Sequence, residues 1–177
     1  MTQTTQNNLP LVIYLRNFVF GVEDSLVSTV GLLSGIAISG ASKESLFLTG
    51  MILICVEAFS MAAGSFLSEH SAEEYMAAGK LKHDRSLVAG VVMFFSYLIS
   101  GLIPLLPYLF YPVDSGFWIS ITASLVALFI LGLIDGRITK VPMWRSALTV
   151  MFVGGAAVAL GVVVGSVLER FQVLNRI

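Results

Sequence analysis

Long apolar runs separated by short polar stretches dominate the pattern along the chain. Read with a window of about 19 residues, the runs fall into five segments, each long enough to cross about 30 Å of hydrocarbon as a helix. These segments lie at 17–38, 46–67, 87–109, 117–138 and 144–168. A polar N-terminus, four short connections and a brief tail make up the rest. The pattern therefore predicts an all-α membrane protein with five transmembrane helices in a single domain.

Composition excludes several other classes of protein. Of the 177 residues, 56% are hydrophobic and 12% are charged, whereas soluble domains have about 25% charged residues. The formal charge of −1 offers nucleic acid no basic surface. The single cysteine, Cys55, lies in an apolar run and has no partner for an internal disulfide or a CxxC metal site. We expect it to be a small buried apolar residue.

Lys and Arg are distributed unequally between the two sides of the predicted bundle. They concentrate before the first span and in the connections after the second and fourth spans. Because cytoplasmic loops carry an excess of these residues, we expect the N-terminus in the cytoplasm and the C-terminus outside or in a lumen. The first ten residues carry no positive charge, which argues against a cleaved signal peptide. The minimal length, without a sorting segment, favours a prokaryotic cell (inner) membrane.

Two of the predicted spans contain acidic residues. The uninterrupted apolar part of the first span, 26–38, is too short to cross, so the helix takes Glu23 and Asp24 into the membrane. Glu57 lies in the middle of the second span, which has no basic residue. An ionised carboxylate at the membrane centre costs about 3 kcal/mol on insertion scales. These acids therefore need a partner or a functional role; the structural alternative for Glu57 is a protonated carboxyl that hydrogen-bonds between helices.

Each acid shares a helix face with small or soft residues. On a helical projection, Asp24 lies on one stripe with Gly31 and Gly35, whose GxxxG spacing allows two backbones to approach closely. The acid in the second span lies on one stripe with Met61 and Gly64. We expect Asp24 and the glycine groove to face the same neighbour, and the three glycines to pack helices at a dimer interface. Met61 is a candidate metal ligand, with gap filling as the alternative.

Two prolines lie near the outer end of the third span. Pro104 has no N–H to donate to the carbonyl of Ser100, so the helix is expected to kink or end there. A carbonyl freed in this way can bind a cation where it lines a cavity, although a packing kink explains the same residue. Together with Gly101 and Pro107, Pro104 forms a candidate hinge.

The cytoplasmic linker at 68–86 carries several side chains that bind metals. Some are spaced four residues apart, which places them on one helix face. They predict a surface that collects metal on an extension of the second helix, although a solvated helix end explains the same residues. The group consists of Glu69, His70, Glu73, Glu74 and Met76.

Three sequence blocks, read in order, resemble the vacuolar iron transporter family. They are FGVEDSLVST at 20–29, EAFSMAAGSFLS at 57–68 and PLLPY at 104–108. The resemblance extends from about Arg16 to the end of the fifth span. It implies a five-span protein that dimerises and exchanges divalent iron, and often manganese or other transition metals, for protons. It also implies that the metal-handling residues are Asp24, Glu57 and Met61.

The chain departs from the family pattern in three places. Ser25 follows Asp24 where the family usually has glycine, and Ser65 stands where many members have glutamate. The linker at 68–86 is also too short for the Glu- and Met-rich module that many eukaryotic members insert there. The chain therefore resembles a short form without the cytoplasmic metal-binding module.

Residues and resemblance together predict a transporter rather than an enzyme. Five spans cannot form two equal halves, so we expect a ten-helix homodimer in which Asp24 is contributed twice. Carboxylates and the Met61 thioether suit Fe²⁺, Mn²⁺ or Zn²⁺ as the transported ion, better than Mg²⁺ or Ca²⁺. The hypothesis is export or sequestration of Fe²⁺, or of Mn²⁺, from the cytoplasm in exchange for protons. The expected partners are the bilayer, a second copy, metal and protons, without a tightly bound cofactor.

Three other functions stay open at this stage. A non-transporting scaffold subunit would also be small and rich in glycine, but it has no use for Glu57 at the middle of the membrane. An intramembrane aspartyl protease needs two opposed carboxylates, for which Asp24 and Asp135 are available, although Asp135 is expected to be an interfacial charge. A proton-coupled carrier of organic solutes is the third alternative, but nothing aromatic or cationic in the spans indicates an organic binding pocket.

Overall fold

Five long helices make up the described part of the chain. The structure is a computed structural model that describes residues 3–77 and 84–174, with side chains at 11–75 and 85–171. Each of the five helices is long and apolar enough to cross a membrane. The helices are α1 (Gln3–Ile38), α2 (Lys43–Ala77), α3 (Asp84–Phe110), α4 (Val113–Thr139) and α5 (Met143–Leu174). The predicted fold class, an all-α membrane protein with five transmembrane helices, is confirmed.

The helices extend beyond the apolar runs from which they were predicted. α1 begins at Gln3 instead of residue 17, and α2 continues to Ala77. The first part of the linker at 68–86 is therefore helix, and residues 78–83 lie outside the described residues. A hydropathy window detects only the apolar part of a helix. Polar residues can continue the helix beyond its apolar part, but they do not raise the mean hydropathy of the window.

Short turns join α1 to α2, α3 to α4 and α4 to α5. Gly40, between α1 and α2, has a φ of 78°, which glycine adopts without strain. Ser42 then caps α2, because its hydroxyl accepts a hydrogen bond from the backbone N–H of Ser45 at 3.2 Å. At the other end of the bundle, Lys140 ends α4 in the left-handed conformation with a φ of 59°. These turns make neighbouring helices antiparallel.

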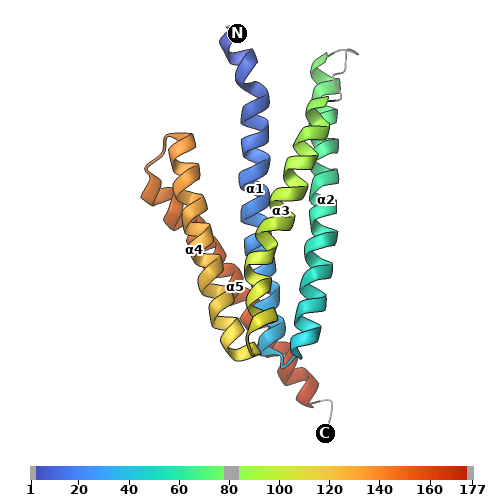
Figure 1. Cartoon of the computed structure of the whole chain (residues 1–177), viewed down its shortest axis with the longest axis vertical. Helices are drawn as coiled ribbons and strands as arrows, with labels where there is room; N and C mark the ends of the chain where they lie inside the picture. The colour runs from blue at the N-terminus through green and yellow to red at the C-terminus, as the bar shows by residue number, and fades with distance from the viewer. Residues whose placement is uncertain (1–2, 78–83, 175–177) are drawn as a thin grey trace.

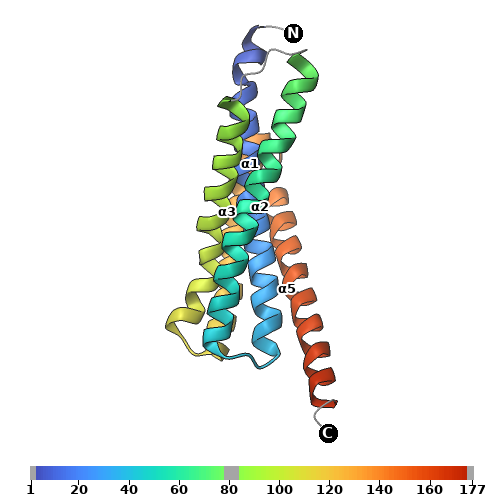
Figure 2. The same ribbon diagram turned by 90° about the vertical axis from the view of Figure 1, so that its right-hand side faces the viewer.

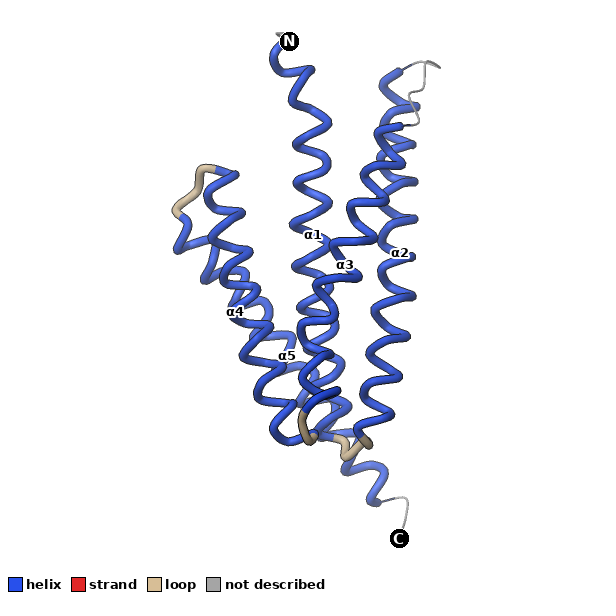
Figure 3. Tube along the Cα trace, in the orientation of Figure 1, coloured by secondary structure: helices blue, strands red, loops and turns tan. Residues whose placement is uncertain are grey.

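α1 occupies the centre of the bundle and packs against each of the other four helices. Of the remaining helices, α2 packs mainly on α3, and α4 packs on α5 (Figures 1 and 2). The two pairs diverge from α1 toward its N-terminal end and come together at the opposite end, near the α1–α2 and α3–α4 turns (Figure 3). The chain termini lie at opposite ends of the molecule (Figure 1).

Large apolar side chains cover the outside of the bundle. Phe59, Trp118 and Phe152 are 70%, 68% and 78% exposed, respectively. Apolar exposure on this scale marks a surface that contacts lipid or protein, not water. Cys55 is exposed as well. Its predicted burial is wrong because a membrane helix is apolar on all sides, so an apolar neighbourhood in the sequence does not indicate which side is buried.

Glycines allow α1 and α5 to approach within backbone contact. A Cβ atom added to Gly35 would lie 2.6 Å from the carbonyl oxygen of Gly161, and one added to Gly31 would lie 3.1 Å from that of Ala157. The predicted GxxxG groove therefore packs on α5 of the same chain instead of on a second copy. A Cβ added to Gly64 would meet no described atom within 4 Å. Of the three glycines, Gly64 alone faces open space in the described structure.

The prolines of α3 do not end the helix, which continues through Pro104 and Pro107 to Phe110. Of the two expected outcomes at Pro104, a kink or a helix end, the end is therefore excluded, and the kink stays a prediction. Neighbouring helices hold this stretch in place, since the Ser120 hydroxyl of α4 donates to the carbonyl of Pro104 at 2.7 Å. Gly101 lies where α3 approaches α1 and α2, and an added Cβ would be 2.7 Å from the hydroxyl oxygen of Ser25. These residues have packing contacts, and their role as a hinge stays a prediction.

Candidate functional site

Glu57 takes part in a hydrogen-bonded chain that links three helices. The hydroxyl of Tyr97, in α3, donates to Glu57 Oε2 at 3.1 Å. The same hydroxyl lies 2.7 Å from the hydroxyl of Ser28 in α1. Ser25, one turn before Ser28, donates to the backbone carbonyl of Tyr97 at 2.7 Å. The side chain of Tyr97 is fully buried, so α1 and α3 together fix the direction from which Glu57 receives its hydrogen bond.

Asp24 lies beside this chain on α1. It is half-buried, as Glu57 is, and the two carboxylates lie within electrostatic reach of each other and of Tyr97. The structure therefore brings the acids of the first and second spans together. Asp24 and the glycine groove face different neighbours, because the groove packs on α5. A helix surrounded by four others uses each part of its surface for a different neighbour.

No basic side chain neutralises these two acids within the described part of the chain. The salt bridge found there joins Arg16 and Glu69, and neither Asp24 nor Glu57 has such a partner. Among residues 3–77 and 84–174, moreover, no three His, Cys, Asp or Glu side chains gather closely enough to hold a metal ion. Two carboxylates alone are too few to complete a metal coordination shell, so a metal ion bound there would need further ligands from other residue types, water or a second copy.

Met61 lines a cavity of about 660 Å³ between α1, α2 and α3. It lies one helical turn beyond Glu57 and lines the cavity together with Met93 of α3. The described lining includes neither Asp24 nor Glu57, so the cavity ends short of the two acids. The lining consists of Arg16, Asn17, Phe20, Ser60, Met61, Gly64, Ser65, Ser68, Glu69 and Met93.

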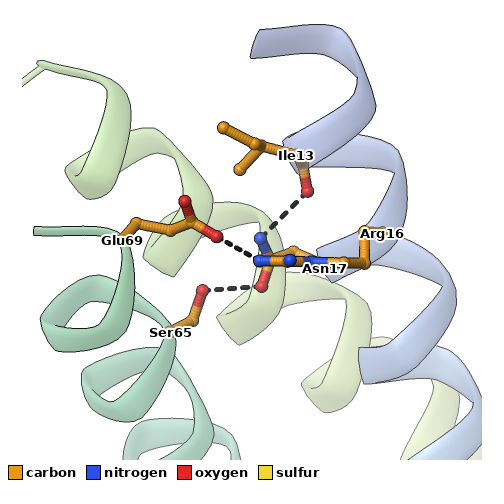
Figure 4. A network of polar contacts seen from close by, with 5 residues as sticks. All are labelled: Ile13, Arg16, Asn17, Ser65 and Glu69. Atoms are coloured by element: carbon orange, nitrogen blue, oxygen red, sulfur yellow. Dashed lines mark hydrogen bonds and ion pairs between the residues drawn. The ribbon is translucent and has the colours of Figure 1, made fainter. Parts of the chain in front are cut away.

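A polar network joins α1 to α2 at one end of this cavity (Figure 4). Arg16 forms an ion pair with Glu69. The side chain of Asn17 donates to the carbonyl of Ile13 at 2.9 Å and accepts a hydrogen bond from the Ser65 hydroxyl at 2.6 Å. Ser65 stands where many family members have glutamate, and here its hydroxyl contacts α1 instead of offering a carboxylate.

The other candidate metal-collecting residues lie on the far end of α2. His70 stacks on Phe66 with ring centroids 5.7 Å apart. Glu73 is half-buried and Glu74 is exposed, while the side chain of Met76 lies outside the described residues. Within the described part these residues do not form a metal site of three or more His, Cys, Asp or Glu ligands. Metal collection by this surface stays a prediction.

A second cavity, of about 450 Å³, lies between α1 and α4. Glu23 and Asp135 both line it, and so does Arg16. Asp135 also accepts a hydrogen bond from the Ser146 hydroxyl of α5 at 3.0 Å. Asp135 therefore lies near Glu23 instead of pairing with Asp24 as a protease dyad requires. It is half-buried and hydrogen-bonded, and its place at the membrane interface stays a prediction.

Two residues of the site escaped the sequence analysis. Tyr97 is a polar aromatic residue inside an apolar span, between Ser96 and Ser100. A hydroxyl group in such a span could have indicated a buried hydrogen bond. Met93 gave no signal, because methionine in a membrane helix is an ordinary apolar residue. The site therefore offers two carboxylates, a tyrosine hydroxyl and two thioethers. Such a set binds either protons or a divalent transition metal.

Comparison with known proteins places the chain among transporters. A sequence model of the VIT family matches residues 15–88 and 76–166. Vacuolar iron transporter homolog 4 of Arabidopsis thaliana is 28% identical over 160 residues, which cover 83% of this chain and 80% of that protein. Homolog 2 from the same plant is 28% identical over 157 residues, with the same coverage. The vacuolar iron transporter of Centaurea cyanus is 36% identical over 92 residues, which cover 50% of this chain and 37% of that protein.

Proposed function

Because this chain belongs to the VIT family and its relatives bear the name vacuolar iron transporter, we propose that it moves divalent iron across a membrane in exchange for protons. The direction is out of the cytoplasm, either to the exterior or into a compartment. Manganese is a second substrate. The plant relatives are vacuolar by name, and they lend no support to a prokaryotic inner membrane.

The observation that carries this proposal is the pairing of Asp24 and Glu57 inside the bundle. The two acids lie within electrostatic reach of each other, and within the described residues neither has a cation as partner. Two uncompensated carboxylates in a low-dielectric environment require positive charge, either as protons or as a metal ion. A scaffold subunit has no need for this arrangement.

Exchange follows from competition for the same oxygens. A carboxylate must lose its proton to bind a metal ion, and metal binding releases that proton. Protons that arrive from the other side of the membrane then displace the metal in turn. Tyr97 donates to Glu57 Oε2, so it orients one oxygen of Glu57 while the other stays available to the ion.

The choice of metal follows from the donor atoms. Met61 lies one turn from Glu57 and lines the adjacent cavity with Met93. Thioether sulfur is a soft ligand, and Fe²⁺ and Mn²⁺ accept a mixed oxygen and sulfur shell more readily than Mg²⁺ or Ca²⁺ do. A second copy of the chain, with its own Asp24, supplies further ligands at a twofold axis in the proposed homodimer. The N-terminal end of α1 faces the cytoplasm in this proposal.

Metal uptake into proteoliposomes under an imposed pH gradient tests the function. We expect the native chain to take up Fe²⁺ and Mn²⁺ and to leave Mg²⁺ outside. Asp24→Asn and Glu57→Gln remove the charge with little change of shape, and each is expected to lower the initial rate at least tenfold. Glu169→Gln is the matched control, because Glu169 is an exposed acid on α5. Full uptake by both variants, irrespective of the gradient, would contradict the proposal and favour a scaffold.

A further inference from the structure

Donor side chains on α2 form a ladder that leads from the Arg16 end of the first cavity to the acid pair. Glu57, Met61, Ser65 and Glu69 follow one another at intervals of four residues. Each step corresponds to about 6 Å along the helix. The cavity between α1, α2 and α3 is lined by the last three of these residues, and Glu57 lies one turn below Met61. The four side chains lie on successive turns of α2, each offset by about 40° from the one before, so an ion that moves along them meets a donor atom at every turn.

Arg16 and Glu69 lie at one end of this cavity, which we call its mouth. Of the lining residues, Arg16 is the nearest to the N-terminus of α1 and Glu69 is the farthest along α2. Because α1 and α2 are antiparallel, the two lie at the same end, where they form an ion pair (Figure 4). The positive charge of the chain's own Arg16 thus occupies the carboxylate that lines this end of the cavity.

The two partners of this ion pair differ strongly in exposure. The side chain of Arg16 is 67% exposed, whereas that of Glu69 is 11% exposed. An exposed guanidinium that leaves its partner is solvated by water at little cost. A carboxylate that is nearly buried has little water available and needs another cation in its place. Arg16 is therefore the partner that can be exchanged, and Glu69 is the one that must stay neutralised.

Arg16 lines a second cavity as well. This is the cavity between α1 and α4, which it lines together with Glu23 and Asp135. Arg16 therefore lines one cavity on each side of α1, and its guanidinium contacts Glu69 in this structure.

We propose that Glu69 is a docking site for the incoming divalent cation and that Arg16 occupies this site when metal is absent. The metal displaces Arg16 from Glu69 and then passes along Ser65 and Met61 toward Glu57. The two thioethers that line the cavity, on Met61 and Met93, lie below the mouth and select for transition metals. This inference rests on the proposed function, because it concerns access to the same transport site.

Single substitutions at the two positions separate this role from a purely structural salt bridge. Arg16→Gln removes the competitor, so the KM for Mn²⁺ is expected to fall about threefold to fivefold. Glu69→Gln removes the docking carboxylate, so the KM is expected to rise about tenfold, in line with the strength of charged contacts. Vmax stays within about twofold in both variants. A structural pair would instead give changes of the same sign, because either substitution breaks the same contact.

Equilibrium binding of Mn²⁺ to the full-length protein in detergent, followed by electron paramagnetic resonance, tests the site without transport. In an Asp24→Asn background, Mn²⁺ binding at the mouth is expected to persist and to weaken about tenfold when Glu69→Gln is added. Arg137→Gln, at an exposed arginine of α4, is the control. If Glu69→Gln does not fold, Glu69→Asp keeps the charge one methylene further back and is expected to give a smaller rise in KM.

The outcomes distinguish this inference from the proposed function. Unchanged transport by Asp24→Asn and Glu57→Gln would overturn the proposed function. Loss of transport in those variants, together with shifts of the same sign or no shift in the Arg16 and Glu69 variants, would overturn the docking site alone. Opposite shifts in KM, with Mn²⁺ binding that depends on Glu69, would support it.

Discussion

At the scale of single residues, Tyr97 orients the carboxylate of Glu57 by donating a hydrogen bond to it. Its hydroxyl contacts Glu57 Oε2 and Ser28, and its backbone carbonyl accepts from Ser25. Removing the hydroxyl in Tyr97→Phe leaves Glu57 without this donor inside the membrane, at a cost of about 1–3 kcal/mol. We expect the KM for metal to rise several-fold in proteoliposome uptake, with the helical content unchanged.

Tyr108→Phe is the matched control for this change. Tyr108 is also fully buried in α3, but it belongs to the apolar cluster with Leu33 and Leu105. We therefore expect Tyr108→Phe to transport metal with the native KM. Equal effects of the two substitutions would show that loss of a buried hydroxyl, not loss of the contact with Glu57, changes the KM.

At the scale of helices, the contact between α1 and α5 depends on glycine. Gly161 packs directly on the backbone of Gly31, so an added side chain cannot be accommodated without moving one helix. Overpacking of this kind costs about 1–3 kcal/mol. Gly161→Val is expected to lower the melting temperature of the purified protein by several degrees, measured by loss of monodispersity on heating. Gly155→Val, at a position where an added Cβ meets nothing within 4 Å in the described structure, is expected to melt as the native chain does.

The sequence predicted the elements better than their contacts. Five spans follow from hydropathy alone, and the family resemblance is confirmed by the match to the VIT family. Which helix each face contacts does not follow, because membrane helices are apolar all round and periodicity carries little information about their neighbours. The GxxxG pair of Gly31 and Gly35 therefore predicted a close approach but not that α5 makes it. The ion pair of Arg16 with Glu69 joins residues 53 positions apart, and no local pattern relates them.

At the scale of the whole molecule, the fold places α1 between two helix pairs that diverge toward its N-terminal end (Figure 1). Cavities lie on both sides of α1, one toward α2 and α3 and the other toward α4. Asp24 and Glu23, adjacent in the sequence, have different acidic neighbours, since Asp24 lies near Glu57 and Glu23 near Asp135. A single central helix thus borders both cavities, and its movement relative to the pairs would change access to both at once.

The central claim is that metal and protons occupy the same carboxylates in turn. The most direct measurement is the pH inside sealed proteoliposomes when Mn²⁺ is added outside without a pH gradient. The account predicts that Mn²⁺ uptake drives protons out, so the interior becomes alkaline, and that Asp24→Asn and Glu57→Gln abolish both fluxes together. Uptake of Mn²⁺ by the native chain with no change in the interior pH, while a potassium ionophore holds the membrane potential at zero, would contradict it.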